Sequence, residues 1–254
     1  MSFREEYFND FMLKASRYGE FNDPFDLVLG SYGASLSKEE SNAFYDAMPE
    51  HYSDPTYYHE TYLDIQAGAR ASVAIMCFTR KFRNILMWSH YANDHTSVCI
   101  GYDYNCEFFH NKFSCNYSDN VGAIREIEYT NQRPKYILPS DLVNDTSEWF
   151  KKSKDWAYEK EHRILLPTND AVCNNEQKDM VFLFKIDPQY IKKVILGCRM
   201  KESTKKYIYE KLSGYEIQIL EAEPHPAHYK LKFENHMLNG SKKANVVYNL
   251  GMDV

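Results

Sequence analysis

The stretch WAYEKEHRILLP, residues 156–167, predicts the element around which the fold is built. Its second part is an apolar run ended by a proline, which is typical of a buried strand. As a strand, residues 159–166 place Glu159, Glu161 and Arg163 on one face, because successive side chains alternate between the two faces of a sheet. Two carboxylates held that close raise the pKa of one of them, and such a pair can act as a base or stabilise a cationic transition state. As a helix, the stretch forms only an ion pair between Glu159 and Arg163, and composition alone favours a structural role.

The rest of the chain alternates short apolar runs with amphipathic stretches. We expect strands at residues 72–79, 98–102, 124–130, 159–166, 181–186, 193–196, 215–221 and 228–233. We expect helices at residues 5–14, 37–48, 57–67, 84–95, 148–158 and 203–212. Because helices come early and strands mostly late, the sequence predicts an α+β fold. Residues 1–233 are expected to form a single domain, with central mixed or mostly antiparallel sheets and flanking helices, and residues 234–254 a polar, mobile C-terminal tail.

Charge and hydropathy exclude several classes of protein. A net charge of -6 and a pI near 5.9 lack the basic excess of non-specific nucleic-acid binding. Lysine runs such as Lys151, Lys152 and Lys154 are interpreted as solvated helix faces. No run of about 18 apolar residues and no signal peptide is present, so we expect no membrane partner and a cytoplasmic location.

Cysteine and glycine spacing narrows the chemistry further. The 6 cysteines form no C-x-x-C pair and no zinc-type spacing with histidine, so we expect free thiols and no metal. None of the 10 glycines falls in a phosphate-loop pattern, which argues against Rossmann enzymes, kinases and P-loop ATPases. The 21 tyrosines suit clefts for planar or sugar-bearing ligands, although core edges with satisfied hydroxyls are the commoner explanation.

A second group of functional side chains lies in LMWSHYANDH, residues 86–95. Ser89 beside His90 does not predict a serine hydrolase, because no G-x-S-x-G elbow is present and adjacent helical residues do not face each other. His90 is either a buried histidine or a ligand donor, and the neighbouring Trp88 and Tyr91 favour a planar ligand.

A third group, Asn22, Asp23 and Asp26, surrounds a proline. Side chains of this type routinely hold turns together, and the residue before a proline is driven out of the helical region. A turn is therefore the first interpretation of these residues.

Five blocks of the sequence together resemble a bacterial family known as domain of unknown function 2971. They are FNDPFD (residues 21–26), CFT (77–79), LMWSHYANDHTSVCIGYD (86–103), WAYEKEHR (156–163) and VILG (194–197), in the family's order and spacing. Thr79 replaces the family's usual serine and keeps its hydroxyl, whereas Ser97 replaces a usual glycine. The family's first strand, Tyr-Lys-Tyr-Arg, has only residues 2–4 in its place here. The resemblance by itself implies no reaction.

The layout is also similar to that of ADP-ribosyltransferases, which include bacterial toxins that modify DNA. That superfamily has a basic or histidine residue on an early strand, then a hydroxyl-bearing strand, then an E-x-E element on a later strand. Arg4, Thr79 and the segment 159–161 follow this order. The resemblance implies that Glu161 holds the nicotinamide ribose and stabilises the oxocarbenium ion as nicotinamide leaves, while Glu159 orients the acceptor.

These comparisons give the expected site and function. The expected catalytic residues are Glu161, Glu159, Thr79 and His90, and the expected NAD-binding residues are Arg4, Trp88, Ser89, Tyr91, Asn22, Asp23, Tyr158 and Arg163. The expected function is an NAD-consuming, ADP-ribosyltransferase-like enzyme, such as a toxin or phage-defence effector inside bacteria, with NAD as substrate and a nucleic acid or protein as acceptor. One alternative is a metal-dependent nucleic-acid hydrolase that uses Asp23, Asp26, His90 and Glu161. Another is a non-catalytic sensing or interaction module in which the E-x-E pair only braces Arg163.

Overall fold

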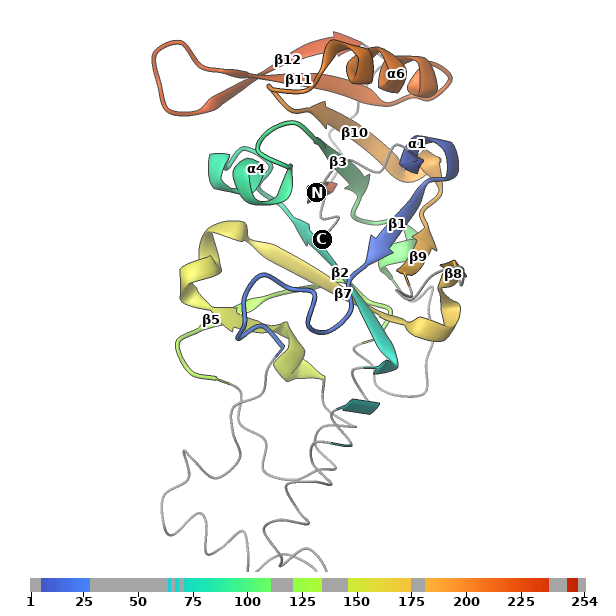
Figure 1. The fold of residues 1–254 in the computed structure, drawn as a ribbon, viewed down its shortest axis with the longest axis vertical. Coiled ribbons are helices and arrows are strands. Elements are labelled where there is room, and N and C mark those ends of the chain that lie inside the picture. Colours follow the sequence, from blue (N-terminus) through green and yellow to red (C-terminus); the bar gives the residue numbers. More distant parts are fainter. Residues whose placement is uncertain are drawn as a thin grey trace, which may run out of the picture.

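The computed structural model describes residues 6–27, 64, 67–68, 71–110, 121–133, 146–174, 181–237 and 246–250. These residues form an α+β fold, as predicted, with few helices. Figure 1 shows the strands of the largest sheet following one another down the molecule, with α6 beside β11 and β12 at one end and α4 beside β3.

The largest sheet has eight strands in the order β12-β11-β10-β3-β13-β2-β7-β4. Their bounds are β2 Val73–Thr79, β3 Val98–Asp103, β4 Arg125–Glu126, β7 Glu161–Pro167, β10 Ile191–Leu196, β11 Gln218–Pro224, β12 Leu231–Met237 and β13 Val246–Leu250. Strands β10 and β11 are parallel, and the other neighbours are antiparallel. The sheet is therefore mixed and mostly antiparallel, as the sequence predicts.

The remaining elements are short. A small sheet has the order β1-β9-β8, formed by β1 Met12–Ala15, β9 Val181–Lys185 and β8 Val172–Asn174, and β5 Glu128–Thr130 pairs in parallel with β6 Lys151–Ser153. The α-helices are α1 Tyr7–Asp10, α4 Ile85–Tyr91 and α6 Glu202–Leu212. The 3-10 helices are η2 Glu107–Phe109, η3 Ser147–Phe150, η4 Lys154–Glu159, η5 Thr168–Asp170 and η6 Pro188–Tyr190.

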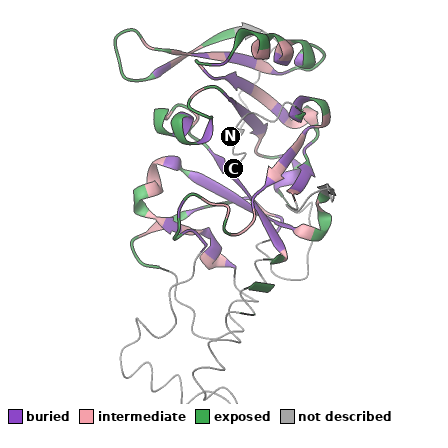
Figure 2. Ribbon diagram, viewed as in Figure 1, coloured by how far each residue is buried: buried purple, intermediate pink, exposed green. Residues whose placement is uncertain are grey.

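Strands β2 and β7 are buried along their whole length (Figure 2). They pair antiparallel from Val73 opposite Pro167 to Thr79 opposite Glu161. Met76 and Phe78 on one face of β2 join the large apolar core that includes α1 and α6. Ile75 and Cys77 on the other face join a second core with Trp149 and Phe150. Burial on both faces explains why these strands read as continuous apolar runs.

The structure confirms most of the predicted strands and corrects several bounds. The strands predicted at residues 72–79, 98–102, 181–186 and 193–196 are present as β2, β3, β9 and β10, whereas the one at 124–130 is divided into β4 and β5. The last two predicted strands begin three residues later, as β11 and β12. The helices predicted at 84–95 and 203–212 are present as α4 and α6.

Two predicted helices are corrected by tertiary pairing. The helix predicted at 5–14 is limited to α1, because Phe11 adopts a left-handed conformation with φ 55° and the chain then pairs with β9. The helix predicted at 148–158 is wrong: η3, β6 and η4 occupy it, because β6 extends to pair with β5. The helices predicted at 37–48 and 57–67 lie outside the described residues, apart from residues 64 and 67.

The end of the described chain differs from the expected tail. Residues 246–250 form β13, which lies between β2 and β3 and pairs with both. Its pairing with β2 is short, at Tyr248 opposite Thr79, and the Asn249 side-chain amide extends it by donating to the Cys77 carbonyl at 3.1 Å. This part of the segment therefore belongs to the central sheet, although it follows a polar stretch that suggests a tail.

Candidate functional site

A group of buried charged side chains lies on the face of β2 and β7 that carries Cys77. We call it the charged cluster, and its members are Asp26, Lys152, Glu159, Glu161 and Arg163. Their exposed fractions are 5%, 9%, 1%, 2% and 0%, respectively. Charged side chains are rarely buried to this extent unless they pair with one another.

Arg163 is the centre of the charged cluster. Its Nη1 and Nη2 atoms donate to the two carboxylate oxygens of Asp26 at 2.8 and 2.5 Å, and its Nε donates to Glu161 Oε1 at 2.5 Å. Nη1 also donates to the Trp149 carbonyl at 3.0 Å. The paired bonds to Asp26 match the fork of the guanidinium, which makes this the most directional contact in the cluster.

Lys152 contacts all three carboxylates of the cluster. Its Nζ donates to Glu159 Oε2 at 2.6 Å and to Glu161 Oε2 at 2.9 Å, and lies 3.6 Å from Asp26 Oδ2. Burial alone would lower the pKa of Lys152, but the charges of Glu161, Asp26 and Glu159 raise it above its ordinary value. Lys152 is therefore a charged core residue, and its assignment to a solvated helix face is wrong.

Glu159 precedes β7 rather than lying within it. It ends η4, and Lys160 then adopts a left-handed conformation with φ 49°, so the strand predicted from residue 159 begins at Glu161. Glu159 nevertheless accepts from Lys152, as Glu161 does, and the Tyr91 hydroxyl donates to Glu159 Oε1. The predicted meeting of the two carboxylates is thus achieved by a turn instead of by strand alternation.

The two carboxylates of the E-x-E element have pKa values shifted in opposite directions. Burial and the nearby charge of Glu161 raise the pKa of Glu159, and Lys152 opposes them only in part. Burial would also raise the pKa of Glu161, but the charges of Arg163 and Lys152 outweigh it and hold this pKa well below its ordinary value. Such a pair offers a carboxylate that stays ionised and a neighbour that holds its proton to a higher pH than an ordinary glutamate does.

Thr79 ties the E-x-E element to the end of β2. It lies opposite Glu161 in the strand register, its hydroxyl donates to the Glu159 carbonyl at 2.5 Å, and the same oxygen accepts the Lys81 N–H at 2.9 Å. Nearby, the Asn84 side-chain amide donates to the Tyr158 carbonyl at 3.3 Å. The hydroxyl-bearing strand and the E-x-E element that are separate in sequence are therefore neighbours in space.

Four residues of this site were not predicted from the sequence: Asp26 as a cluster member, Lys152, Tyr129 and Cys77. The Tyr129 hydroxyl accepts the Glu161 N–H at 2.8 Å. Burial, followed by the charge of Glu161, raises the pKa of the Cys77 thiol well above its ordinary value. The sequence does contain one indication that Asp26 belongs to the site, because Asp26 lies in the FNDPFD block that carries the family resemblance. Nothing local distinguishes Lys152 from the lysines beside it.

Of the site residues predicted on helix α4, Tyr91 contacts the charged cluster through Glu159. Ser89 and His90 lie on the exposed side of the helix. Trp88 is fully buried in an apolar core, and its Nε1 donates to the Phe82 carbonyl at 2.6 Å. The structure therefore places Trp88 in the packing of α4, and His90 away from the carboxylates.

The residues around Pro24 form the predicted turn. Asp23 is buried and accepts the Phe25 N–H at 2.9 Å, while Asn22 is exposed. The Asp26 N–H donates to the Asp23 carbonyl at 3.1 Å, and the Asp26 carboxylate accepts from Arg163. Arg4 lies outside the described residues.

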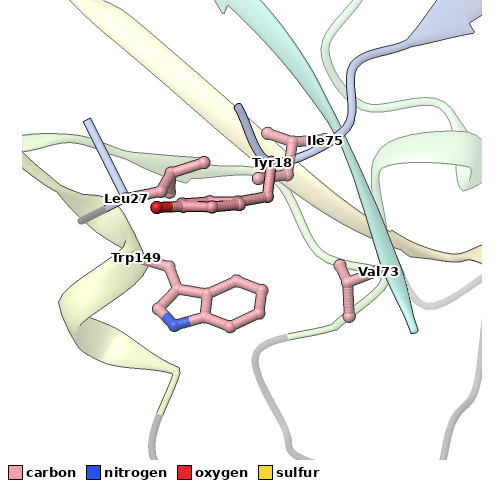
Figure 3. A pocket seen from close by; sticks show the side chains of 5 residues that line it. All are labelled: Tyr18, Leu27, Val73, Ile75 and Trp149. Carbon is pink, nitrogen blue, oxygen red and sulfur yellow. The ribbon is translucent and has the colours of Figure 1, made fainter. Parts of the chain in front are cut away.

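A shallow apolar pocket lies next to the charged cluster on the same side of β2. Tyr18, Leu27, Val73, Ile75 and Trp149 line it, with the Tyr18 and Trp149 side chains on facing walls (Figure 3). Leu27 follows Asp26 in the chain, and Trp149 supplies the carbonyl that binds Arg163, so the pocket shares its wall with the cluster.

The described part of the chain shows no second site of a familiar kind. Within it, no group of three or more His, Cys, Asp or Glu side chains is arranged to hold a metal ion. No helix within the same residues has the length and apolar character needed to cross a bilayer. Cys77, Cys99, Cys106 and Cys198 are free thiols.

Comparison with known proteins gives one result. Residues 87–164 match the family described as a protein of unknown function (DUF2971). The family resemblance is confirmed for this stretch. The DUF2971 match spans most of α4 and continues into β7, so it includes Tyr91, Lys152, Glu159, Glu161 and Arg163, while Asp26 and Thr79 precede it. No curated protein and no solved structure matches the chain significantly.

Proposed function

We propose that this protein is an NAD-consuming, ADP-ribosyltransferase-like enzyme whose reacting groups are the carboxylates of Glu159 and Glu161. The observation that carries the proposal is the pairing of Thr79 with Glu161 across β2 and β7, with the Thr79 hydroxyl bonded to the Glu159 carbonyl. The ADP-ribosyltransferase pattern requires a hydroxyl-bearing strand and an E-x-E element to work together. Their proximity here supports that pattern.

The charge of the cluster fits the chemistry. Three carboxylates, Asp26, Glu159 and Glu161, face two cations, Lys152 and Arg163, which leaves one negative charge in excess when Glu159 is ionised. In ADP-ribosyl transfer the bond from the ribose C1′ to nicotinamide breaks, and its electron pair leaves with the nicotinamide nitrogen. The ribose then carries the positive charge of an oxocarbenium ion, which a fixed excess negative charge stabilises.

The opposite pKa shifts divide the roles of the two carboxylates. Glu161 stays ionised because its pKa is lowered, so it stabilises the oxocarbenium ion. Glu159 has a raised pKa, so it takes the proton of the acceptor hydroxyl or amine as the acceptor attacks C1′. The half-buried ring of Trp156 has its centroid 5.0 Å from Lys152 Nζ, so a partly accessible aromatic ring contacts the cluster.

A second candidate function is a non-catalytic ligand-sensing or interaction module. The 2% exposure of Glu161 and its bond to the fully buried Arg163 favour it, because a carboxylate in such a position braces an arginine without reacting. In that case the E-x-E pair contributes stability alone.

No observation of similar weight favours the metal-dependent nucleic-acid hydrolase. Asp26 and Glu161 both accept hydrogen bonds from Arg163, Asp23 accepts one within its own turn, and His90 is exposed on α4. Incubation with nucleic acid and magnesium or manganese tests it, since the hydrolase predicts cleavage that a chelator stops.

The decisive experiment measures nicotinamide released from NAD by the wild type, by Glu161→Gln and by Glu210→Gln. Glu210 is an exposed carboxylate on α6 and serves as the matched control. We expect release by the wild type and the control, and a loss of roughly 10²–10³-fold in Glu161→Gln, the range seen when a transition-state stabiliser is removed.

Urea unfolding of the same proteins separates the two candidates. An inactive Glu161→Gln that remains folded supports catalysis. Wild-type activity in that variant contradicts the assignment of Glu161. No release by the wild type, together with altered stability in Glu161→Gln, favours the sensing module.

A further inference from the structure

A basic loop adjoins the E-x-E element. It consists of residues 80–83, Arg-Lys-Phe-Arg, and connects β2 to α4. Arg80, Lys81 and Arg83 are all exposed, and Phe82 between them is half-buried. Three cations within four residues stand out in a chain whose net charge is -6.

The basic loop is fixed at both ends to the main chain of η4. At its start, the Thr79 hydroxyl donates to the Glu159 carbonyl and accepts the Lys81 N–H. At its end, the Asn84 side chain donates to the Tyr158 carbonyl and accepts the Leu86 N–H, which caps α4. The loop is therefore held against the main chain of Tyr158 and Glu159.

Aromatic rings orient the two arginines. The Arg83 guanidinium lies 4.9 Å from the ring centroids of both Phe82 and Phe233, and the Arg80 guanidinium lies 5.0 Å from that of Tyr104. A guanidinium stacked on a ring keeps its N–H groups at the edge, where they can donate to an oxyanion.

Lys81 and Arg83 have no acidic partner within the described part of the chain. The buried acids pair with Lys152 on β6 and Arg163 on β7 instead. Among the described residues, Lys81 and Arg83 thus present positive charge beside the E-x-E pair that no acid neutralises.

We propose that residues 80–83 bind the phosphates of a nucleotide ligand whose sugar lies at Glu159 and Glu161. The inference rests on the proposed function for the identity of that sugar, and it adds the part of the site that selects a phosphorylated substrate. The arginine edges and the Lys81 ammonium bind the phosphate oxygens, while the fixed loop sets the distance from the phosphates to the reacting carbon.

Binding of ADP-ribose, measured by titration calorimetry, tests the loop without requiring catalysis, because ADP-ribose has no nicotinamide to release. Adenosine is the comparison ligand, since it has the same base and sugar but no phosphate. The variants are Lys81→Gln, Arg83→Gln and the double variant. Lys211→Gln is the matched control, because Lys211 is an exposed cation lying 5.5 Å from the Tyr207 ring on α6.

We expect wild-type protein to bind ADP-ribose at least tenfold more tightly than adenosine. The double variant should lose about tenfold or more in ADP-ribose affinity, while Lys211→Gln stays within about twofold, and binding should weaken as salt is added. Circular dichroism of each variant checks that the fold is retained. Equal affinity of the double variant and the wild type for ADP-ribose overturns the inference, as does equal binding of adenosine and ADP-ribose.

A short oligothymidylate serves as a third probe and distinguishes the sources of the phosphates. Loss of oligothymidylate binding in the double variant, with no ADP-ribose binding by the wild type, supports the loop but identifies its ligand as a polynucleotide. If neither probe binds the wild type, the inference fails.

The outcome is separable from that of the proposed function. ADP-ribose binding through the loop without nicotinamide release retains this inference and removes the enzyme. Nicotinamide release by the wild type, together with unchanged ADP-ribose binding in the double variant, retains the enzyme and removes this inference.

Discussion

Arg163 and Asp26 form a two-pronged ion pair between positions 137 residues apart in the chain, with N–O distances of 2.8 and 2.5 Å. Asp26 ends the block FNDPFD and Arg163 ends the block WAYEKEHR, so two of the sequence blocks that carry the family resemblance bind each other directly. The contact explains in physical terms why both blocks end in a charged residue. The pair offsets the cost of burying both charges, with Glu161 and Lys152 as further partners.

Replacing Arg163 should therefore destabilise the fold. Arg163→Met leaves the carboxylates of Asp26 and Glu161 buried beside Lys152 alone, and we expect the free energy of unfolding to fall by about 3–5 kcal/mol. Urea titration measures it. Lys206→Met on α6, whose side chain is 80% exposed, should change it by less than about 0.5 kcal/mol. A loss below about 1 kcal/mol in Arg163→Met would contradict the central role of this arginine.

The raised pKa of Glu159 predicts a specific dependence of stability on pH. The ordinary pKa of the Glu159 carboxyl group is 4.5. Above this pH the unfolded chain releases the carboxyl proton, while the folded protein retains it. The contribution of Glu159 to the free energy of unfolding therefore falls as pH rises from 4.5 until the folded-state pKa is passed, by at most about 1.4 kcal/mol per pH unit.

Urea unfolding of the wild type and Glu159→Gln over a pH series measures this contribution. The stability of the wild type minus that of the variant should decline with rising pH. Glu161→Gln is the opposite case, because the lowered pKa of Glu161 gives stability that is present above 4.5 and lost as pH falls below it. A flat difference for Glu159 would show that its carboxyl group is not shifted.

The Tyr91 hydroxyl should contribute to stability through its bond to Glu159. Tyr91→Phe keeps the ring in its apolar core and removes the donor, which we expect to cost about 1–3 kcal/mol of unfolding free energy. Thermal and urea unfolding measure the loss. Tyr229→Phe is the control, since Tyr229 is fully exposed at 103% and its hydroxyl is in water. Equal stabilities of the two variants would argue against the bond.

Gly197 should tolerate no side chain. A Cβ atom there would lie 2.1 Å from the His95 carbonyl oxygen and 2.7 Å from that of Ser97, and both are main-chain atoms that cannot turn aside. We expect Gly197→Ala to cost about 1–3 kcal/mol or more in the free energy of unfolding. Gly214→Ala, where nothing lies within 4 Å, should be close to neutral. Similar urea midpoints for both variants would refute this close approach.

The sequence predicted the strands of the central sheet more reliably than the segments that cover it. Strands β2 and β3 are buried on both faces, and such strands read directly as apolar runs. The apolar spacing of segment 148–158 predicts a helix, which the structure does not contain. Pairing of β6 with β5 and the attraction of Lys152 to three carboxylates decide its structure, and neither is visible locally.

The candidate site was predicted only in part, because some of its residues are close in sequence and others are not. Glu159, Glu161 and Arg163 are close in sequence, so their meeting could be anticipated from the strand and turn that join them. Asp26 and Lys152 reach the site from other elements, and their local sequence suggested a turn and a solvated surface. Charge balance in a buried cluster depends on all its members at once, which a window of neighbouring residues does not contain.

The position of β13 has a consequence for how the chain folds. Strands β2 and β3 do not pair with each other, since β13 lies between them, so the middle of the sheet stays open until residue 250 has been synthesised. Such a high contact order predicts slow folding, and until β13 arrives the two waiting strands expose unpaired main-chain edges. A nascent chain of this protein is therefore a candidate client for chaperones that shield strand edges during synthesis.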